Sequence, residues 1–190
     1  DCRYGKRNRR LIMDSRMKST RAIGEGISRC PTPPRVWLQA STATIYSHRY
    51  DAPNDEASGI LGGREDDVPD TWRFSIDVAT AWEQAAREAI VPDTRQVLLR
   101  SAMTMSPDRG GVFDVLRRMT LLRLDGTVGD GRQFVSWIHE RDFVNAIYWL
   151  IDREQFNGAV NLASPNPLPY GEFIQHLRAA CGVRIGLPAP

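Results

Sequence analysis

The chain is poor in cysteine, with three such residues among 190. Cys2, Cys30 and Cys181 are odd in number and lie far apart, so a disulfide scaffold is a poor interpretation. Their spacing also differs from the closely spaced ligand pairs of zinc modules, and no metal ligands are predicted. Few, scattered cysteines are typical of proteins that fold in a reducing compartment, and we expect the cytoplasm.

Long hydrophobic runs are also missing. The chain has no stretch of about 18 apolar residues, the length that spans a bilayer, and it does not open with a charged segment followed by an apolar one. We therefore expect neither a membrane span nor a signal peptide. Wholesale disorder is not expected either, because 42% hydrophobic and 25% charged residues are ordinary globular values.

The net charge of +2 hides an uneven distribution, since residues 1–29 hold nine Lys or Arg against three Asp or Glu. A solvated basic helix face would explain this excess, and so would a site for a phosphate-bearing ligand. Nucleic-acid binding is a weaker alternative, because the basic block offers only Tyr4 for base stacking and matches no known module. We expect neither nucleic acid nor membrane as a partner.

Apolar periodicity predicts helices that alternate with short buried strands. Helices are predicted over residues 6–29, 70–90, 111–119, 140–152 and 170–181. Extended segments are predicted over residues 35–41, 94–100, 134–138 and 159–162. Residues 47–70 are rich in Asp, Asn, Gly and Pro, which indicates a long loop. This alternation is typical of an α/β fold with a parallel sheet.

A glycine-rich phosphate-binding turn is absent from the sequence. In doubly wound sheets this turn joins the first strand to its helix and holds the pyrophosphate of a dinucleotide. Gly126, Gly129 and Gly131 do not follow a strand and open a helix, so we expect them to form an ordinary loop. The sequence therefore lacks the element through which this fold class binds its nucleotide.

The first predicted helix has a stripe of residues at helical spacing that includes Ile12, Arg16, Ile23 and Ile27. A charged side chain on an inward stripe needs a partner or must reach solvent. For Arg16 that partner could be a dinucleotide phosphate or an acidic residue of this chain. In the helix over 140–152 the aromatic residues are expected in the core.

Five regions carry, in order, a resemblance to a known family. They are Asp14–Arg21 with Pro33–Tyr46, Trp82–Ala86, Leu99–Pro107, Gly129–Asp142 and Gly158–Pro167. The most specific block is Arg-Gln-Phe-Val-Ser-Trp-Ile-His, residues 132–139. With these motifs the chain resembles an extended short-chain dehydrogenase/reductase of the nucleoside-diphosphate-sugar epimerase branch, over nearly all of its length.

The resemblance implies a partial doubly wound, Rossmann-like parallel sheet with a small substrate-side α/β portion. We expect residues 1–105 to form the C-terminal half of a dinucleotide-binding domain, and residues 106–190 to form the substrate-side portion, truncated at its C-terminus. The family's glycine-rich half and its C-terminal domain, which follows a stretch like Leu187–Pro190, would then lie outside the sequence. We expect this chain alone not to bind the dinucleotide.

The resemblance further implies NAD(P) as cofactor, NADP rather than NAD, and a nucleotide sugar as substrate. The implied activity is epimerase- or dehydratase-like, with hydride transfer between the cofactor and a substrate hydroxyl. The alternative is a non-catalytic protein of the same fold that binds nucleotide and acts as a sensor or binds a partner.

Family members hold the substrate hydroxyl with a Ser or Thr after a central strand, and move its proton with a Tyr-x-x-x-Lys pair on the next helix. Thr42 best matches the hydroxyl position, although such strand-end hydroxyls also bond the local backbone. The positions of the pair fall on Ser75 and Ala79, and neither residue can serve as a phenol or an ammonium. Tyr46 is the remaining candidate acid, with a structural role beside the strand as the alternative.

Four residues are candidates for cofactor binding: Arg16, Ser41, Arg100 and Thr104. The resemblance places the helix that carries Arg16 beside the cofactor groove. Arg100 and Thr104 come at and just after the end of the second buried strand, and open α/β sheets bind ligands at the carboxyl ends of their strands.

Overall fold

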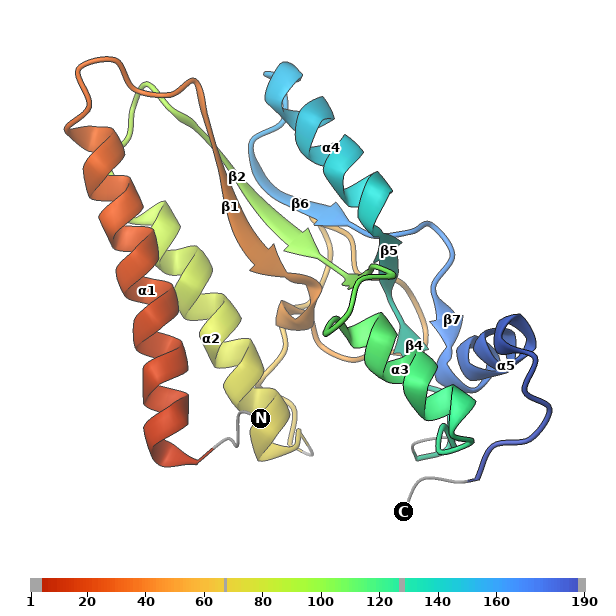
Figure 1. Cartoon of the computed structure of the whole chain (residues 1–190). Helices are drawn as coiled ribbons and strands as arrows, with labels where there is room; N and C mark the ends of the chain where they lie inside the picture. The colour runs from red at the N-terminus through yellow and green to blue at the C-terminus, as the bar shows by residue number, and fades with distance from the viewer. Residues whose placement is uncertain (1–4, 67, 127–128, 188–190) are drawn as a thin grey trace. The chain divides into compact units, whose positions relative to one another are not determined.

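The computed structural model describes residues 5–66, 68–126 and 129–187. The expectations for Cys2, for Tyr4 and for the end of the Leu187–Pro190 stretch lie outside the described residues. Helices and strands alternate along the chain (Figure 1), in the order α1 (Lys6–Ser28), β1 (Val36–Thr42), the 3-10 helix η1 (Ala43–Ile45), α2 (Asp70–Arg87), β2 (Arg95–Ser101), β3 (Met103–Met105), α3 (Val112–Leu121), β4 (Phe134–Val135), β5 (Trp137–His139), α4 (Glu140–Asp152), β6 (Gly158–Leu162), β7 (Leu168–Pro169) and α5 (Tyr170–Cys181).

The chain folds into two compact units. Unit 1 comprises Asp1–Ser101 and Ile147–Asn161, and unit 2 comprises Ala102–Ala146 and Leu162–Pro190. The predicted division had a single boundary after residue 105, whereas these units interleave. The reason is that β6, late in the chain, lies beside β2 in the sheet of unit 1.

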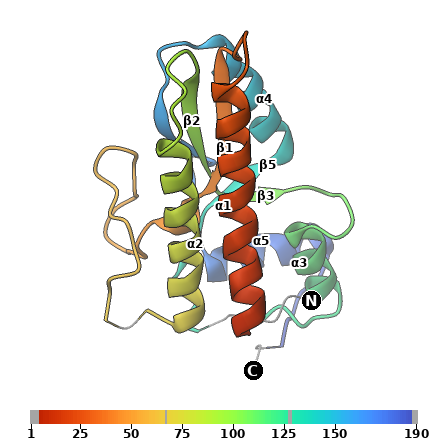
Figure 2. The same cartoon turned by 90° about the vertical axis from the view of Figure 1, so that its left-hand side faces the viewer.

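Unit 1 is built on a three-stranded sheet with the order β1-β2-β6, in which β1 and β2 are parallel from Val36 opposite Arg95 to Thr42 opposite Ser101. Helices α1 and α2 lie side by side against one face of this sheet (Figure 2). The central strand β2 buries four consecutive residues, 97–100, as expected for a strand covered on both faces. The α/β class and the Rossmann-like parallel arrangement predicted from the sequence are confirmed.

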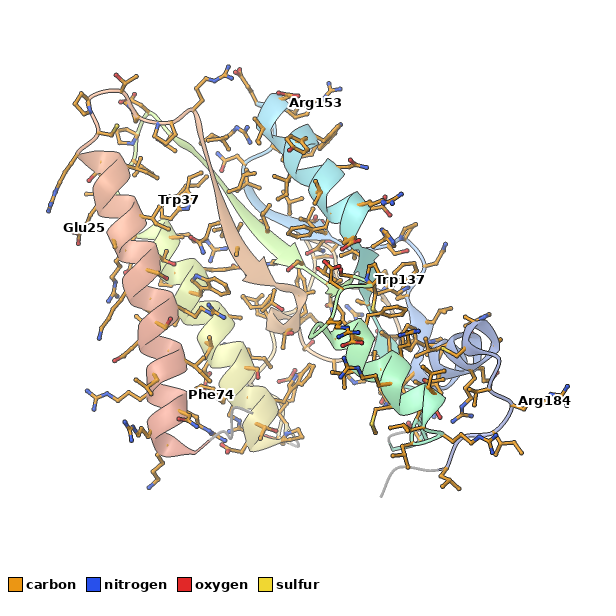
Figure 3. All side chains as sticks on the ribbon, in the orientation of Figure 1. Glu25, Trp37, Phe74, Trp137, Arg153 and Arg184 are labelled. Atoms are coloured by element: carbon orange, nitrogen blue, oxygen red, sulfur yellow. The ribbon has the colours of Figure 1, made fainter. Side chains whose placement is uncertain are left out.

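The core between the sheet and the helix pair forms around Trp37. This side chain extends from β1 toward α1 and α2 (Figure 3) and packs against Leu98 of β2 and Ala86 of α2. Ile27 of α1 and Ala89, just after α2, cover the cluster. The small side chains of Ala86 and Ala89 allow the backbone of this part of the chain to approach the indole ring closely.

We predict opposite effects from adding one methyl group at two glycines of α1. A Cβ atom on Gly24 would stand 2.7 Å from Cβ of Ala89, whereas one on Gly26 would have no atom within 4 Å. Gly24→Ala should therefore lower the free energy of unfolding by about 1–3 kcal/mol through overpacking. Gly26→Ala should raise it by about 0.5–1 kcal/mol, because alanine suits a helix interior better than glycine. Urea unfolding of both variants checks this, and equal effects would contradict the close approach at Gly24.

Unit 2 combines two short sheets with α3 and α5. Strand β3 pairs in parallel with β5, and β4 pairs antiparallel with β7. Helix α3 packs against α5 and β3. An ion pair links α5 to the segment after α3: Nε of the half-buried Arg178 donates to Oδ2 of the buried Asp125 at 3.0 Å. In the part of the chain that the structure describes, no helix is both long and apolar enough to cross a membrane.

Candidate functional site

The carboxyl ends of β1 and β2 lie at the same edge of the unit 1 sheet, because the strands are parallel and Thr42 stands opposite Ser101. We call this region the carboxyl edge and define it by Ser41, Thr42, Tyr46 and Arg100. Ligands of open α/β sheets bind outside the carboxyl ends of the strands. The carboxyl edge is therefore the candidate site of unit 1.

A buried ion pair between Glu83 of α2 and Arg100 of β2 underlies this edge; the two residues are 1% and 5% exposed. The guanidinium binds the carboxylate in a fork, with Nε to Oε1 and Nη2 to Oε2 both at 2.8 Å. Ser41 donates its hydroxyl to Oε1 at 2.6 Å, and Arg87 donates to Oε2 at 2.8 Å. Two-bond geometry of this kind fixes both side chains as well as neutralising their charges.

The charges of this pair persist at neutral pH. Burial alone would raise the pKa of Glu83, but hydrogen bonds from Arg100 and Ser41 and the nearby cationic charges outweigh it, so this pKa lies below its ordinary value. The hydrogen bond to Glu83 raises the pKa of Arg100. Because folding lowers the pKa of Glu83, the stabilisation is present at neutral pH and is lost as the pH falls through the folded-state value.

A chain of hydrogen bonds extends from Arg100 to the long loop. Its Nη1 donates to the hydroxyl of Tyr46 at 2.8 Å, and that hydroxyl donates to Oδ1 of Asn161 on β6 at 2.9 Å. Asn161 donates its amide Nδ2 to the carbonyl of Asn54 and its backbone N–H to the carboxylate of Glu56. The loop after η1 is thus fastened to the sheet beside the carboxyl edge.

The two predicted hydroxyl residues both have partners within unit 1. Thr42 accepts the backbone N–H of Thr44 at 3.2 Å and donates to the Thr44 hydroxyl at 3.0 Å, so it caps η1. Ser41 is bound to Glu83. The bonds of Thr42 are the local ones given above as the alternative, whereas the bond of Ser41 reaches a side chain of α2. The substrate-binding role of Thr42 and the cofactor-binding role of Ser41 stay predictions.

Arg16 lies on the side of α1 that packs against α2, one turn before the buried Thr20, and its side chain reaches solvent. Thr20 and Gly24 are the buried residues of this helix, and Arg16 is exposed. Its guanidinium lies 4.9 Å from the ring centroid of Trp82, whose Nε1 donates to Thr20 at 2.9 Å. Thr20 and Gly24 are buried because α2 packs against this side of the helix. Within the described ranges Arg16 makes no ion pair, so its cofactor-binding role stays a prediction.

The remaining predicted residues differ in their surroundings. Arg100 has intramolecular partners at all three guanidinium nitrogens, and a direct contact with a cofactor stays a prediction for it. Thr104 belongs to unit 2, where it is half-buried on β3 opposite Ile138 of β5. Tyr46 is buried, with its hydroxyl both donating and accepting a hydrogen bond.

The helix positions that match the Tyr-x-x-x-Lys pair are filled by small residues. Ser75 donates its hydroxyl to the carbonyl of Thr71, one turn earlier in α2. Ala79 is buried in a cluster with Ile45 and Tyr46. The cluster would enclose the stem of any longer side chain at position 79.

Sequence reasoning missed Glu83 and Asn161. A signal for Glu83 was present, because Ile76, Ala79, Glu83 and Ala86 share one face of α2 at helical spacing and all four are buried. A carboxylate on such a face predicts a buried cation. Asn161 offered no comparable signal, since its role depends on a loop about a hundred residues away in the sequence.

A cavity of about 730 Å³ lies at the opposite, amino ends of the strands. Its lining includes Arg35, Ile90, Asp93, Arg95 and Glu154. The guanidinium of Arg95 donates hydrogen bonds to the backbone carbonyls of residues 150, 151 and 156. Among the described residues, no group of His, Cys, Asp and Glu side chains could hold a metal ion.

Comparisons with known proteins identify relatives, although no protein-family model matches the chain. It is 30% identical over 190 residues to the human "Epimerase family protein SDR39U1", covering 99% of this chain and 60% of the relative. It is 27% identical to the chloroplastic homologue from Arabidopsis thaliana, of which it covers 51%. The chain thus spans little more than half the length of these relatives.

Solved structures agree with this result. The crystal structure of human SDR39U1 with NADPH superimposes with a TM-score of 0.86 at 29% identity, over 99% of this chain and 60% of that one. A nucleoside-diphosphate sugar epimerase from Corynebacterium glutamicum gives a TM-score of 0.74 at 23% identity, over 99% of this chain and 39% of that one. The similarity to the Corynebacterium glutamicum structure shows a shared fold only.

Proposed function

This chain belongs to the epimerase family of extended short-chain dehydrogenases/reductases, and we propose that the full-length protein binds NAD(P), with NADP preferred, at the carboxyl edge. The observation that carries the proposal is the likeness, over 99% of this chain, to a relative solved with NADPH. The parallel strands β1 and β2 support it, because they supply the edge where this fold class binds ligands.

The guanidinium of Arg16, which forms no ion pair with the described residues, fits a phosphate-bearing ligand, since a fork of N–H donors suits a phosphate oxygen pair. Ser41 and Arg100 are proposed to support the cofactor through the Glu83 network, and Thr104 to contact its nicotinamide end. Bound NAD(P) would supply hydride transfer. Should turnover be found, we propose that Thr42 holds the substrate hydroxyl and that Tyr46 exchanges its proton.

We propose a nucleotide sugar as the substrate class, and residues 1–105 and 106–190 as the nucleotide-binding and substrate-side portions. A second candidate function is nucleotide binding without catalysis, as a sensor or a partner-binding protein. The observation that favours it is the burial of Ala79, at the position that matches the lysine of the pair, against Tyr46. Free thiols at Cys30 and Cys181 support a reducing compartment, for which we propose the cytoplasm.

Arg16→Ala should weaken the binding of NADPH by full-length protein about tenfold or more, since loss of a charge-assisted contact costs roughly 1.5–3 kcal/mol. Fluorescence titration with NADPH measures the dissociation constant. Arg7→Ala is the matched control, because Arg7 is an exposed residue of the same helix. This variant should bind NADPH as tightly as the wild type does. An unchanged affinity for Arg16→Ala would limit Arg16 to packing on Trp82.

A further inference from the structure

Asn161 connects strand β6 to Tyr46 and to the loop that follows Tyr46 in the sequence. Its Oδ1 accepts the hydroxyl of Tyr46 at 2.9 Å, and its Nδ2 donates to the carbonyl of Asn54 at 3.1 Å. Its backbone N–H donates to the carboxylate of Glu56 at 2.6 Å. One residue of β6 thus holds both Tyr46 and residues 47–61, which we call the edge loop.

The hydrogen bonds around Tyr46 can run in one direction only. The guanidinium of Arg100 donates to the Tyr46 hydroxyl at 2.8 Å, and a guanidinium cannot accept a hydrogen bond. The hydroxyl therefore uses a lone pair for Arg100 and its proton for Oδ1 of Asn161. This fixes the amide as well, because Nδ2 then faces the carbonyl of Asn54 as a donor. Position 161 needs a side chain that both accepts and donates, as an amide does.

The edge loop returns to the carboxyl edge after leaving it. The backbone N–H of Ser47 donates to the carbonyl of Ile60 at 2.7 Å, and Tyr46 forms a β-bridge with Leu61. A Cβ atom on Gly59 would lie 2.6 Å from Cε1 of Tyr46, so the loop backbone packs directly on the ring. Compact loops whose two ends meet are frequently functional. The edge loop is therefore placed to form a wall of a ligand site at the carboxyl edge.

We propose that Asn161 is a positioning residue of the NAD(P) site, which holds the edge loop in place as a wall beside the bound cofactor. This inference rests on the proposed function, because it takes the carboxyl edge as the cofactor site. Asn161 acts through the loop and need not touch the cofactor itself. Releasing the loop from Asn161 would then weaken cofactor binding although no direct ligand contact is removed.

The first test measures loop exchange and NADPH affinity in full-length protein. Asn161→Ala should make the amides of residues 57–61 exchange about three- to tenfold faster without cofactor, the scale of one lost hydrogen bond. In fluorescence titration, the variant should bind NADPH more weakly by a similar factor. Asn157→Ala is the matched control, because Asn157 is an exposed asparagine just before β6. The control should change neither quantity.

Asn161→Asp separates positioning from general destabilisation. At neutral pH the new carboxylate accepts from Tyr46 but cannot donate to the carbonyl of Asn54, so the edge loop should exchange about three- to tenfold faster than in the wild type. A protonated carboxyl group both accepts and donates. The ratio of variant to wild-type exchange should therefore return toward one as the pH falls to about 4, near the ordinary pKa of aspartate. Charged neighbours of this position are Glu56 and, beyond Tyr46, Arg100. Both are present in the wild type, which is therefore compared at each pH.

The possible failures of this inference and of the proposed function differ. An unchanged NADPH affinity of Asn161→Ala, or unchanged exchange of its edge loop, would overturn the positioning role and leave the proposed function intact. An exchange ratio for Asn161→Asp that stays constant on acidification would also overturn that role, because general destabilisation does not depend on the new carboxyl group. Absence of NADPH binding by the wild type would overturn the proposed function and this inference with it. Circular dichroism establishes that each variant remains folded.

Discussion

Glu83→Ala is expected to lower the free energy of unfolding by about 3–5 kcal/mol, the usual cost of removing one partner from a buried ion pair. Arg100 would keep its buried position and its charge but lose both bonds to the carboxylate. Ser41 would lose the acceptor of its hydroxyl as well. Urea unfolding at neutral pH measures the effect.

Glu88→Ala is the matched control, because Glu88 lies one turn later and forms an exposed ion pair with Arg21 at 3.7 Å. Exposed pairs contribute about 0–1 kcal/mol, so this variant should stay close to the wild type. If Glu83→Ala fails to fold, the double variant Glu83→Leu with Arg100→Met supplies the test. Removing both charges should restore folding, since no charge is then buried alone. Equal losses for Glu83→Ala and Glu88→Ala would contradict the account.

The same pair predicts a pH dependence. Hydrogen bonds and nearby cations hold the pKa of Glu83 below its ordinary value, so the wild type loses this stabilisation only as the pH falls through that lowered value. The difference in unfolding free energy between the wild type and Glu83→Ala should therefore shrink on acidification. A constant difference down to strongly acidic pH would mean that the carboxylate charge is not what stabilises the fold.

Full-length protein is expected to show negligible epimerase or dehydrogenase turnover on common nucleotide sugars, even with its cofactor bound. Proton transfer by a positioned phenol contributes about 10²–10⁴-fold to such reactions. Ser75 and Ala79 occupy the places of the phenol and its ammonium partner, and a serine hydroxyl keeps its proton near neutral pH. NADPH absorbance and product chromatography on a panel of nucleotide sugars measure the turnover.

Turnover of about 1 s⁻¹ or more, an ordinary enzyme rate, would contradict this expectation. Tyr46 would then be the first residue to replace, by phenylalanine. The double variant Ser75→Tyr with Ala79→Lys should not restore activity, because position 79 is enclosed by Ile45 and Tyr46. A lysine there would lose hydration, which disfavours its charged form. Ser75→Tyr alone is the matched control, and it should fold more stably than the double variant.

Helix ends were predictable where local chemistry fixes them. The predicted helices over 140–152 and 170–181 coincide with α4 and α5. Acidic residues in the first turn of α4 suit the helix dipole, and Gly182, with a positive φ of 67°, ends α5 in a conformation that glycine adopts without strain. These signals lie within a few residues of the boundaries they set.

Burial was harder to predict, because it depends on which face another element covers. The aromatic residues of α4 were expected in the core, yet Tyr148 and Trp149 are exposed. On α1, Ile27 of the predicted stripe does pack against the core, but Ile23 is exposed, and the packing of α2 buries Thr20 and Gly24. Apolar spacing predicts a stripe, but small residues decide where two helices approach most closely.

Binding of NAD(P) at the carboxyl edge is tested most directly by hydrogen exchange of the full-length protein with and without NADPH. Residues 42–47, at the end of β1, should exchange more slowly when NADPH is bound, because open α/β sheets bind ligands there. Residues 91–96, which line the cavity at the amino ends of the strands, should exchange unchanged. Protection confined to residues 91–96, or no protection in either segment, would contradict the account.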